Sequence, residues 1–101
     1  MSIELNLKVL WFSEILGLAI DQKFDQQLYP LTSYYIWPRT EAWEQLKLEL
    51  DSRAWLPKED KIKILNNAAE IMNCWGEDQS LEAFKSVSLR FSNVTFLTCE
   101  N

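Results

Sequence analysis

The residues best suited to acid–base chemistry are the carboxylates Glu41 and Glu44, three positions apart in a segment with helical spacing. That spacing places them on neighbouring faces of a helix, where two acids can work as a pair. The alternative is a solvated helix face, the usual setting for exposed acids. The chain contains no His, so it lacks the commonest general base and any Ser–His or Cys–His couple. We therefore predict that the protein is not an enzyme and has no catalytic residues.

The sequence also lacks the residue patterns of cofactor and metal sites. Its only glycines, Gly17 and Gly76, are too few for a phosphate-binding loop or a dinucleotide-binding fingerprint. Cys74 and Cys99 have neither the spacing nor the partners of a metal cluster, and we expect free thiols in a reducing compartment. We predict no cofactor, no metal ion and no small-molecule substrate.

Three basic residues, Arg39, Lys58 and Lys61, are the candidate contacts with a partner. Several other cations have an acid three or four positions away on the same predicted helix, in the pairs Glu44–Lys47, Glu49–Arg53 and Glu59–Lys63. Lys58 and Lys61 project from an apolar helix face, where they either extend from the core edge into water or reach a phosphate. Arg39 lies near Trp37, and its guanidinium either stacks on an aromatic ring or binds a phosphate or carboxylate.

Composition indicates a single folded domain over residues 1–101. Hydrophobic residues make up 48% of the chain and aromatic residues 13%, which argues against disorder. The formal charge of −5 argues against a protein that holds nucleic acid mainly by neutralising phosphates. Tyr34, Tyr35 and Trp37 could form a base-stacking platform, but such platforms lie in positive grooves, so we expect core packing instead. The apolar run over residues 5–20 is too short and too interrupted to span a membrane.

The first part of the chain is typical of strands. Residues 3–11 alternate between apolar and polar side chains, the pattern of a half-buried strand, and residues 15–21 predict a second one. Residues 22–32 are polar and contain a proline, and we interpret them as the longest internal loop. A short strand over residues 34–37 should stop at Pro38, which lacks a backbone donor.

Two helices should follow this strand. One is predicted over residues 41–53, with Thr40 as its N-cap. The other is predicted over residues 57–75, with apolar side chains around half of its circumference. Gly76 is placed to end that helix in a left-handed cap.

The remaining residues predict a helical turn over 80–84 and strands over 87–91 and 94–96. Together these elements indicate an α+β fold, a small antiparallel sheet with two main helices packed on one face.

The most distinctive stretch of sequence is residues 33–47, which contains Trp37-Pro38-Arg39 and then Ala42-Trp43. Here the chain resembles the plastid-specific ribosomal protein three family, found in the small ribosomal subunit of chloroplasts and cyanobacteria. The resemblance covers residues 5–76 and is carried also by the segment 71–75. Two local departures are residues 26–29, where the family has a small glycine-containing loop, and Cys74, where an aromatic residue is usual. Residues 77–101 have no counterpart that we can place and form a C-terminal extension.

The resemblance implies a non-catalytic structural component of the 30S subunit that supports translation in the cyanobacterial cytoplasm or the plastid stroma. Because the chain is acidic, we expect it to dock on neighbouring ribosomal proteins, with limited 16S rRNA contact and no membrane partner. Arg39, Lys58 and Lys61 are then the candidate rRNA or protein contacts. The alternative function is a free protein–protein adaptor that uses the apolar face of the helix predicted over residues 57–75.

Overall fold

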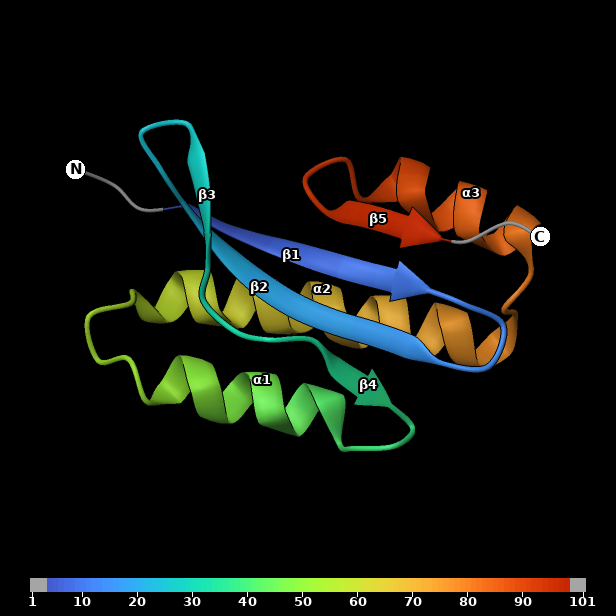
Figure 1. Ribbon diagram of the computed structural model, residues 1–101, viewed down its shortest axis with the longest axis horizontal. Coiled ribbons are helices and arrows are strands. Elements are labelled where there is room, and N and C mark those ends of the chain that lie inside the picture. Colours follow the sequence, from blue (N-terminus) through green and yellow to red (C-terminus); the bar gives the residue numbers. More distant parts are fainter. Residues whose placement is uncertain (1–3, 99–101) are drawn as a thin grey trace.

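The computed structural model describes residues 4–98 as one sheet with helices packed against it (Figure 1). Four of the five strands run in the order β3-β2-β1-β5, and the fifth, β4, pairs with β2. The elements in chain order are β1 (Glu4–Trp11), β2 (Leu16–Phe24), β3 (Gln27–Pro30), β4 (Tyr35–Trp37), α1 (Ala42–Asp51), α2 (Lys58–Glu77), α3 (Leu81–Arg90) and β5 (Thr95–Thr98). The predicted α+β class is confirmed.

The central unit is the long antiparallel hairpin of β1 and β2, paired from Glu4 with Lys23 to Trp11 with Leu16. Side chains alternate across a strand, so every second residue of each strand faces the helices. The helix-facing side chains are at most 2% exposed and are Leu7, Val9, Trp11, Leu16, Leu18 and Ile20. The alternation of apolar and polar residues that predicted β1 therefore arises from this buried face.

The predicted loop over residues 22–32 is wrong. The chain continues β2 to Phe24, turns through Asp25 and Gln26, and returns as β3. Both turn residues have positive φ, 51° and 65°, as a two-residue hairpin turn requires. The hairpin extends beyond the helices, and all of β3 is exposed, so its sequence has no apolar alternation to mark it.

The two main helices lie on one face of the sheet, with α1 against β2 and β4 and α2 against β1 and β2 (Figure 1). In α1 the buried residues are Ala42, Leu46 and Leu50. In α2 they are Ile64, Leu65, Ala68, Ile71 and Trp75. Both helices were predicted from their periodicity, and both are confirmed as elements.

The predicted helix caps are wrong. Thr40 does not cap α1, because its hydroxyl donates to the Ile36 carbonyl at 3.2 Å and Glu41 occupies the N-cap position. Gly76 does not end α2, which continues to Glu77 with no glycine at positive φ. The Gln79 side chain donates to the Trp75 carbonyl instead, and thereby satisfies a group that a left-handed cap would otherwise satisfy.

The predicted strand over residues 87–91 is also wrong, because these residues complete and follow α3. Ser80 caps α3 by accepting a hydrogen bond from the Ala83 amide at 3.1 Å. The apparent alternation misled because Val87 is buried while Leu89 is 83% exposed on the outer side of the helix.

The predicted strand over residues 94–96 corresponds to β5, which runs parallel to β1, so the sheet is mixed rather than wholly antiparallel. A parallel pair needs a long crossover, and the helices supply it. Phe84 of α3 packs edge-on against Trp11 and Phe96, with ring centroids 6.0 Å apart in each pair. The C-terminal segment thus contributes to the same core as the hairpin.

Burial on α1 predicts a large difference between two leucines of that helix. Leu46 is fully buried, whereas Leu48 is 63% exposed. Leu46→Ala should lower the free energy of unfolding by about 2–5 kcal/mol, the cost of a cavity in a packed core. Leu48→Ala should change it by less than about 0.5 kcal/mol. Urea denaturation of both variants measures the difference, and equal losses would place α1 in a different orientation.

Candidate functional site

The junction between β4 and α1 forms a corner with an apolar groove beside it. The backbone turns sharply after β4, through a cis peptide bond between Trp37 and Pro38, and the Thr40 amide donates to the Ile36 carbonyl at 2.8 Å. The groove has a volume of about 420 Å³ and lies between this corner and the second half of α2. Its lining residues are Trp37, Trp43, Ala69, Met72, Asn73 and Gly76.

Hydrogen bonds hold the indoles of Trp43 and Trp75 at the core. The Trp43 indole donates to the Leu65 carbonyl at 2.9 Å and ties α1 to α2. The Trp75 indole donates to the Phe12 carbonyl at 2.8 Å and ties α2 to the turn after β1. A buried indole N–H requires such a partner. The indole N–H of Trp43 therefore has a structural role, while the rings of Trp43 and Trp37 line the groove.

The other end of α1 is held by a charged contact. Arg53 pairs with Glu49 at 3.0 Å, as predicted, and also donates to the Leu31 carbonyl at 3.2 Å, which fastens the helix end to the segment before β4. Burial raises the pKa of the nearby Tyr35 phenol, and the Glu49 carboxylate raises that pKa further. Tyr35 is half-buried and packs against the core.

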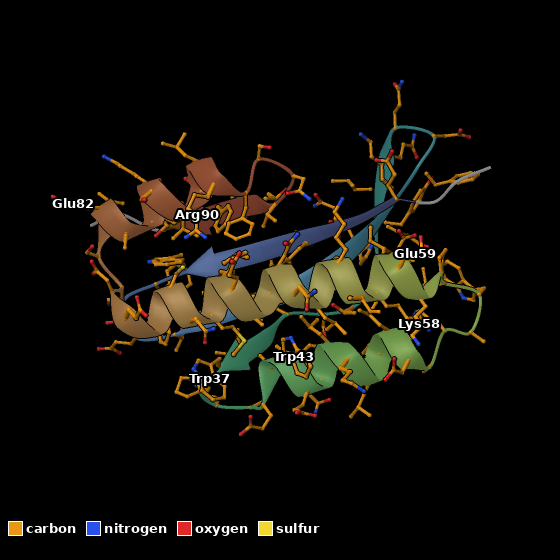
Figure 2. The ribbon with its side chains drawn as sticks, turned by 180° about the vertical axis from the view of Figure 1, so that it is seen from behind. Trp37, Trp43, Lys58, Glu59, Glu82 and Arg90 are labelled. Atoms are coloured by element: carbon orange, nitrogen blue, oxygen red, sulfur yellow. The ribbon has the colours of Figure 1, made fainter. Side chains whose placement is uncertain are left out.

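The three predicted contact residues do not come together in one cluster. Arg39 is exposed in the turn before α1, and Lys58 is exposed at the first position of α2. The whole of α1 lies between them, about 15 Å of helix. Figure 2 shows Lys58 and Trp37 at opposite ends of α1. Lys61 is half-buried one turn after Lys58, so only the two lysines share a surface.

None of these three cations forms an ion pair within residues 4–98. The cation–π contacts of the described chain involve Lys8 and Arg90, so the stacking alternative for Arg39 is not seen there. Two predicted helix pairs, Glu44 with Lys47 and Glu59 with Lys63, are also not formed among those residues. Lys47 pairs with Asp51 instead, at 2.9 Å.

Trp55 is a candidate contact that sequence reasoning missed. It lies in the turn between α1 and α2, is 54% exposed, and precedes Lys58 by three residues. Ile62, farther along α2, is 48% exposed. The available signal was that Trp55 falls outside the apolar stripes of both helices. The α1–α2 turn and the start of α2 therefore combine an exposed aromatic ring with Lys58 and Lys61.

The other residues considered in the sequence analysis are the carboxylates Glu41 and Glu44 and the two cysteines. Glu41 and Glu44 are exposed at the start of α1, as on a solvated helix face. Cys74 is a free, half-buried thiol, and Cys99 lies outside the described residues. Residues 4–98 contain no group of His, Cys, Asp and Glu side chains that could hold a metal ion, and none of their helices is long and apolar enough to cross a membrane.

Comparison with known proteins gives one consistent result. The family model described as plastid and cyanobacterial ribosomal protein (PSRP-3 / Ycf65) matches residues 31–78. The small ribosomal subunit protein cS23 of Cyanidium caldarium is 42% identical over 94 residues, which cover 93% of this chain and 92% of the relative. The cS23 of Gracilaria tenuistipitata var. liui is 37% identical over 91% of this chain and 93% of its own. A probable cS23 of Synechococcus sp. (strain JA-3-3Ab) is 49% identical over 68% and 70%.

The indole of Trp43 supports a prediction with a matched control. Trp43→Phe keeps an aromatic ring but removes the hydrogen bond to Leu65, and should lower the free energy of unfolding by at least about 1 kcal/mol. Trp55→Phe changes an exposed ring for which the described chain shows no hydrogen bond, and should cost less than about 0.5 kcal/mol. Chemical denaturation compares the two. A Trp55 variant as destabilised as the Trp43 variant would contradict this assignment of roles.

Proposed function

The chain belongs to the plastid and cyanobacterial ribosomal protein family PSRP-3/Ycf65, and we propose that it enters the small subunit mainly through neighbouring ribosomal proteins. As a member of this family it is a structural component of the small ribosomal subunit and supports translation. The finer proposal is that it acts without catalysis, in the cytoplasm of a cyanobacterium or the stroma of a plastid, with limited 16S rRNA contact.

Charge is the observation that carries the proposed mode of docking. The protein has 15 acidic and 10 basic residues. Four of the cations are already paired with acids of the same chain, in the contacts Lys8–Asp21, Lys47–Asp51, Arg53–Glu49 and Arg90–Glu70. An RNA-bound protein gains most of its affinity from Lys and Arg side chains that neutralise phosphates. Within residues 4–98 six cations are left without an acidic partner, against 15 acids in the chain, and we infer from this balance that protein neighbours supply most of the contact.

Apolar exposure supports the same mode. The Trp37–Trp43 groove and the exposed ring of Trp55 are surfaces of the kind that bury against protein, where Trp is enriched at contact centres. The alternative function, a free adaptor that uses the apolar face of α2, does not fit the structure. That face is already buried in the domain core, from Ile64 to Trp75.

Within this docking mode, Arg39, Lys58 and Lys61 are the proposed contacts with rRNA phosphates. They lie outside the ion pairs of the described chain, and Arg39 and Lys58 are exposed. Lys58 and Lys61 are close enough to face one stretch of phosphates beside Trp55. Arg39 would meet a separate contact at the other end of α1.

Sedimentation tests the functional proposal. An epitope-tagged full-length chain should travel with the small-subunit and whole-ribosome fractions of a sucrose gradient prepared from its own organism. A chain that stays at the top of the gradient under conditions that preserve ribosomes would overturn the proposal.

Charge removal tests the proposed phosphate contacts. The triple variant Arg39→Ala, Lys58→Ala, Lys61→Ala should retain small-subunit association, but with a flatter dependence on salt, because each lost phosphate contact lowers the log–log slope by about one. The matched control removes three other cations by Lys47→Ala, Lys85→Ala and Arg90→Ala and should leave the slope unchanged. Identical salt dependence for both triples would assign Arg39, Lys58 and Lys61 structural roles only.

A further inference from the structure

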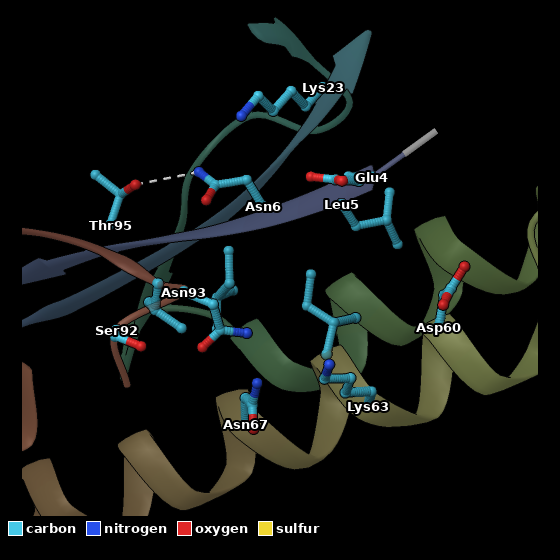
Figure 3. Close-up of a pocket in the computed structure, with 13 residues that line it drawn as sticks. Glu4, Leu5, Asn6, Lys23, Asp60, Lys63, Asn67, Ser92, Asn93 and Thr95 are labelled. Atoms are coloured by element: carbon cyan, nitrogen blue, oxygen red, sulfur yellow. Dashed lines mark hydrogen bonds between the residues drawn. The ribbon is translucent and has the colours of Figure 1, made fainter. Parts of the chain in front are cut away.

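A second cleft, which shares no lining residue with the tryptophan groove, opens where the sheet is incomplete (Figure 3). Its volume is about 650 Å³, within the range of about 300–1,000 Å³ that ligand sites occupy. One wall is residues 4–7 of β1, the opposite wall is the first half of α2, and residues 92–95 close one end. Figure 3 shows Lys63 and Asn67 on α2, across the cleft from the strand, and Asn93 in the turn before β5.

The strand wall of this cleft has an unpaired backbone edge. β5 pairs with β1 only from Lys8 to Trp11, whereas β2 pairs with β1 from Glu4 onward. Residues 4–7 therefore have β2 on one side and, within the described chain, no strand on the other. In an antiparallel ladder, alternate residues direct their N–H and C=O groups away from the partner strand. Two of these four residues thus direct backbone donors and acceptors toward the cleft.

The side chains of the cleft match a polypeptide better than a phosphate backbone. Its base is apolar, with Leu7, Ile64 and Val94 each no more than 8% exposed. Its rim carries two acids, Glu4 and Asp60, two cations, Lys23 and Lys63, and the amides of Asn67 and Asn93. Balanced charge gives no net attraction for phosphates. An unpaired strand edge, in contrast, is a template for another strand, and an apolar base with a polar rim accepts its side chains.

We propose that an extended segment of a neighbouring small-subunit protein lies in this cleft and pairs with residues 4–7 of β1, so that it continues the edge position that β5 occupies farther along. This partner assignment rests on the proposed ribosomal function, while the mode of binding rests on the unpaired edge. Four residues of strand span about 13 Å. A short segment is therefore enough to fill the cleft.

Photo-crosslinking tests the occupant. In two separate variants, the full-length chain carries benzoylphenylalanine in place of Asn67, on the α2 rim of the cleft, or in place of Ser92, at its closed end, and is isolated in small subunits. The matched control has the probe at Glu82, exposed at the start of α3 and outside the cleft (Figure 2). Both cleft probes should crosslink to one and the same short segment of one ribosomal protein, and the Glu82 probe should not reach that segment.

Hydrogen exchange tests the backbone pairing. Within residues 4–7, the amides that point toward the cleft should exchange at least about tenfold more slowly in the subunit than in the isolated chain. A segment held by side chains alone would leave these amide rates unchanged, and that result would overturn strand addition.

A crosslink to rRNA or to a second copy of this chain would overturn the proposal as well. So would the absence of any crosslink from both cleft probes. These failures are distinct from failure of the functional proposal. In the latter case, the unmodified chain would not sediment with small subunits at all.

Discussion

Burial of one face of the β1–β2 hairpin against α1 and α2 is the interaction on which the rest of the structure depends. Three alternate side chains of β1 and three of β2 are removed from water there. Each fully buried aliphatic residue contributes roughly 1.5–3 kcal/mol relative to an exposed one. This face fixes the register of the hairpin, because a slip of one residue would expose the whole set. The register in turn places β4 beside the first half of β2, and so positions the Trp37 corner where α1 begins.

Elements that bury one face in this core could be predicted, because their hydrophobic pattern follows that face. The alternation of β1 and the helical period of α2 each reflect one buried face. β3 has no such hydrophobic pattern, because it is an exposed edge strand whose partner is the end of β2. Residues 87–91 were misleading, because their alternation matches a strand, whereas in the structure Val87 and Phe91 are buried and Leu89 is exposed on the other side of α3. The helix is capped by Ser80 and packs through Phe84 on Trp11 and Phe96.

The candidate site could be predicted in composition but not in arrangement. The residues of the 33–47 stretch indicated both the corner and the family, and the family is the source of the functional conclusion. The separation of Arg39 from Lys58 follows from the bounds of the helix between them, whereas the exposure of Trp55 in the turn depends on how α1 and α2 pack. The gap in the sheet beside residues 4–7 depends on where β5 starts, which no local pattern in β1 reveals.

The charge of the chain and its family membership make a consistent physical picture once protein neighbours are given the larger share of its contacts. An acidic domain can be held in a ribonucleoprotein if its neighbours are proteins and its free cations reach only a few phosphates. The most direct measurement is a high-resolution structure of the small subunit with this chain in place, from which the area buried against each neighbour can be computed. We predict that most of the buried area of the chain faces ribosomal proteins. A structure in which rRNA covers most of that area would contradict the account.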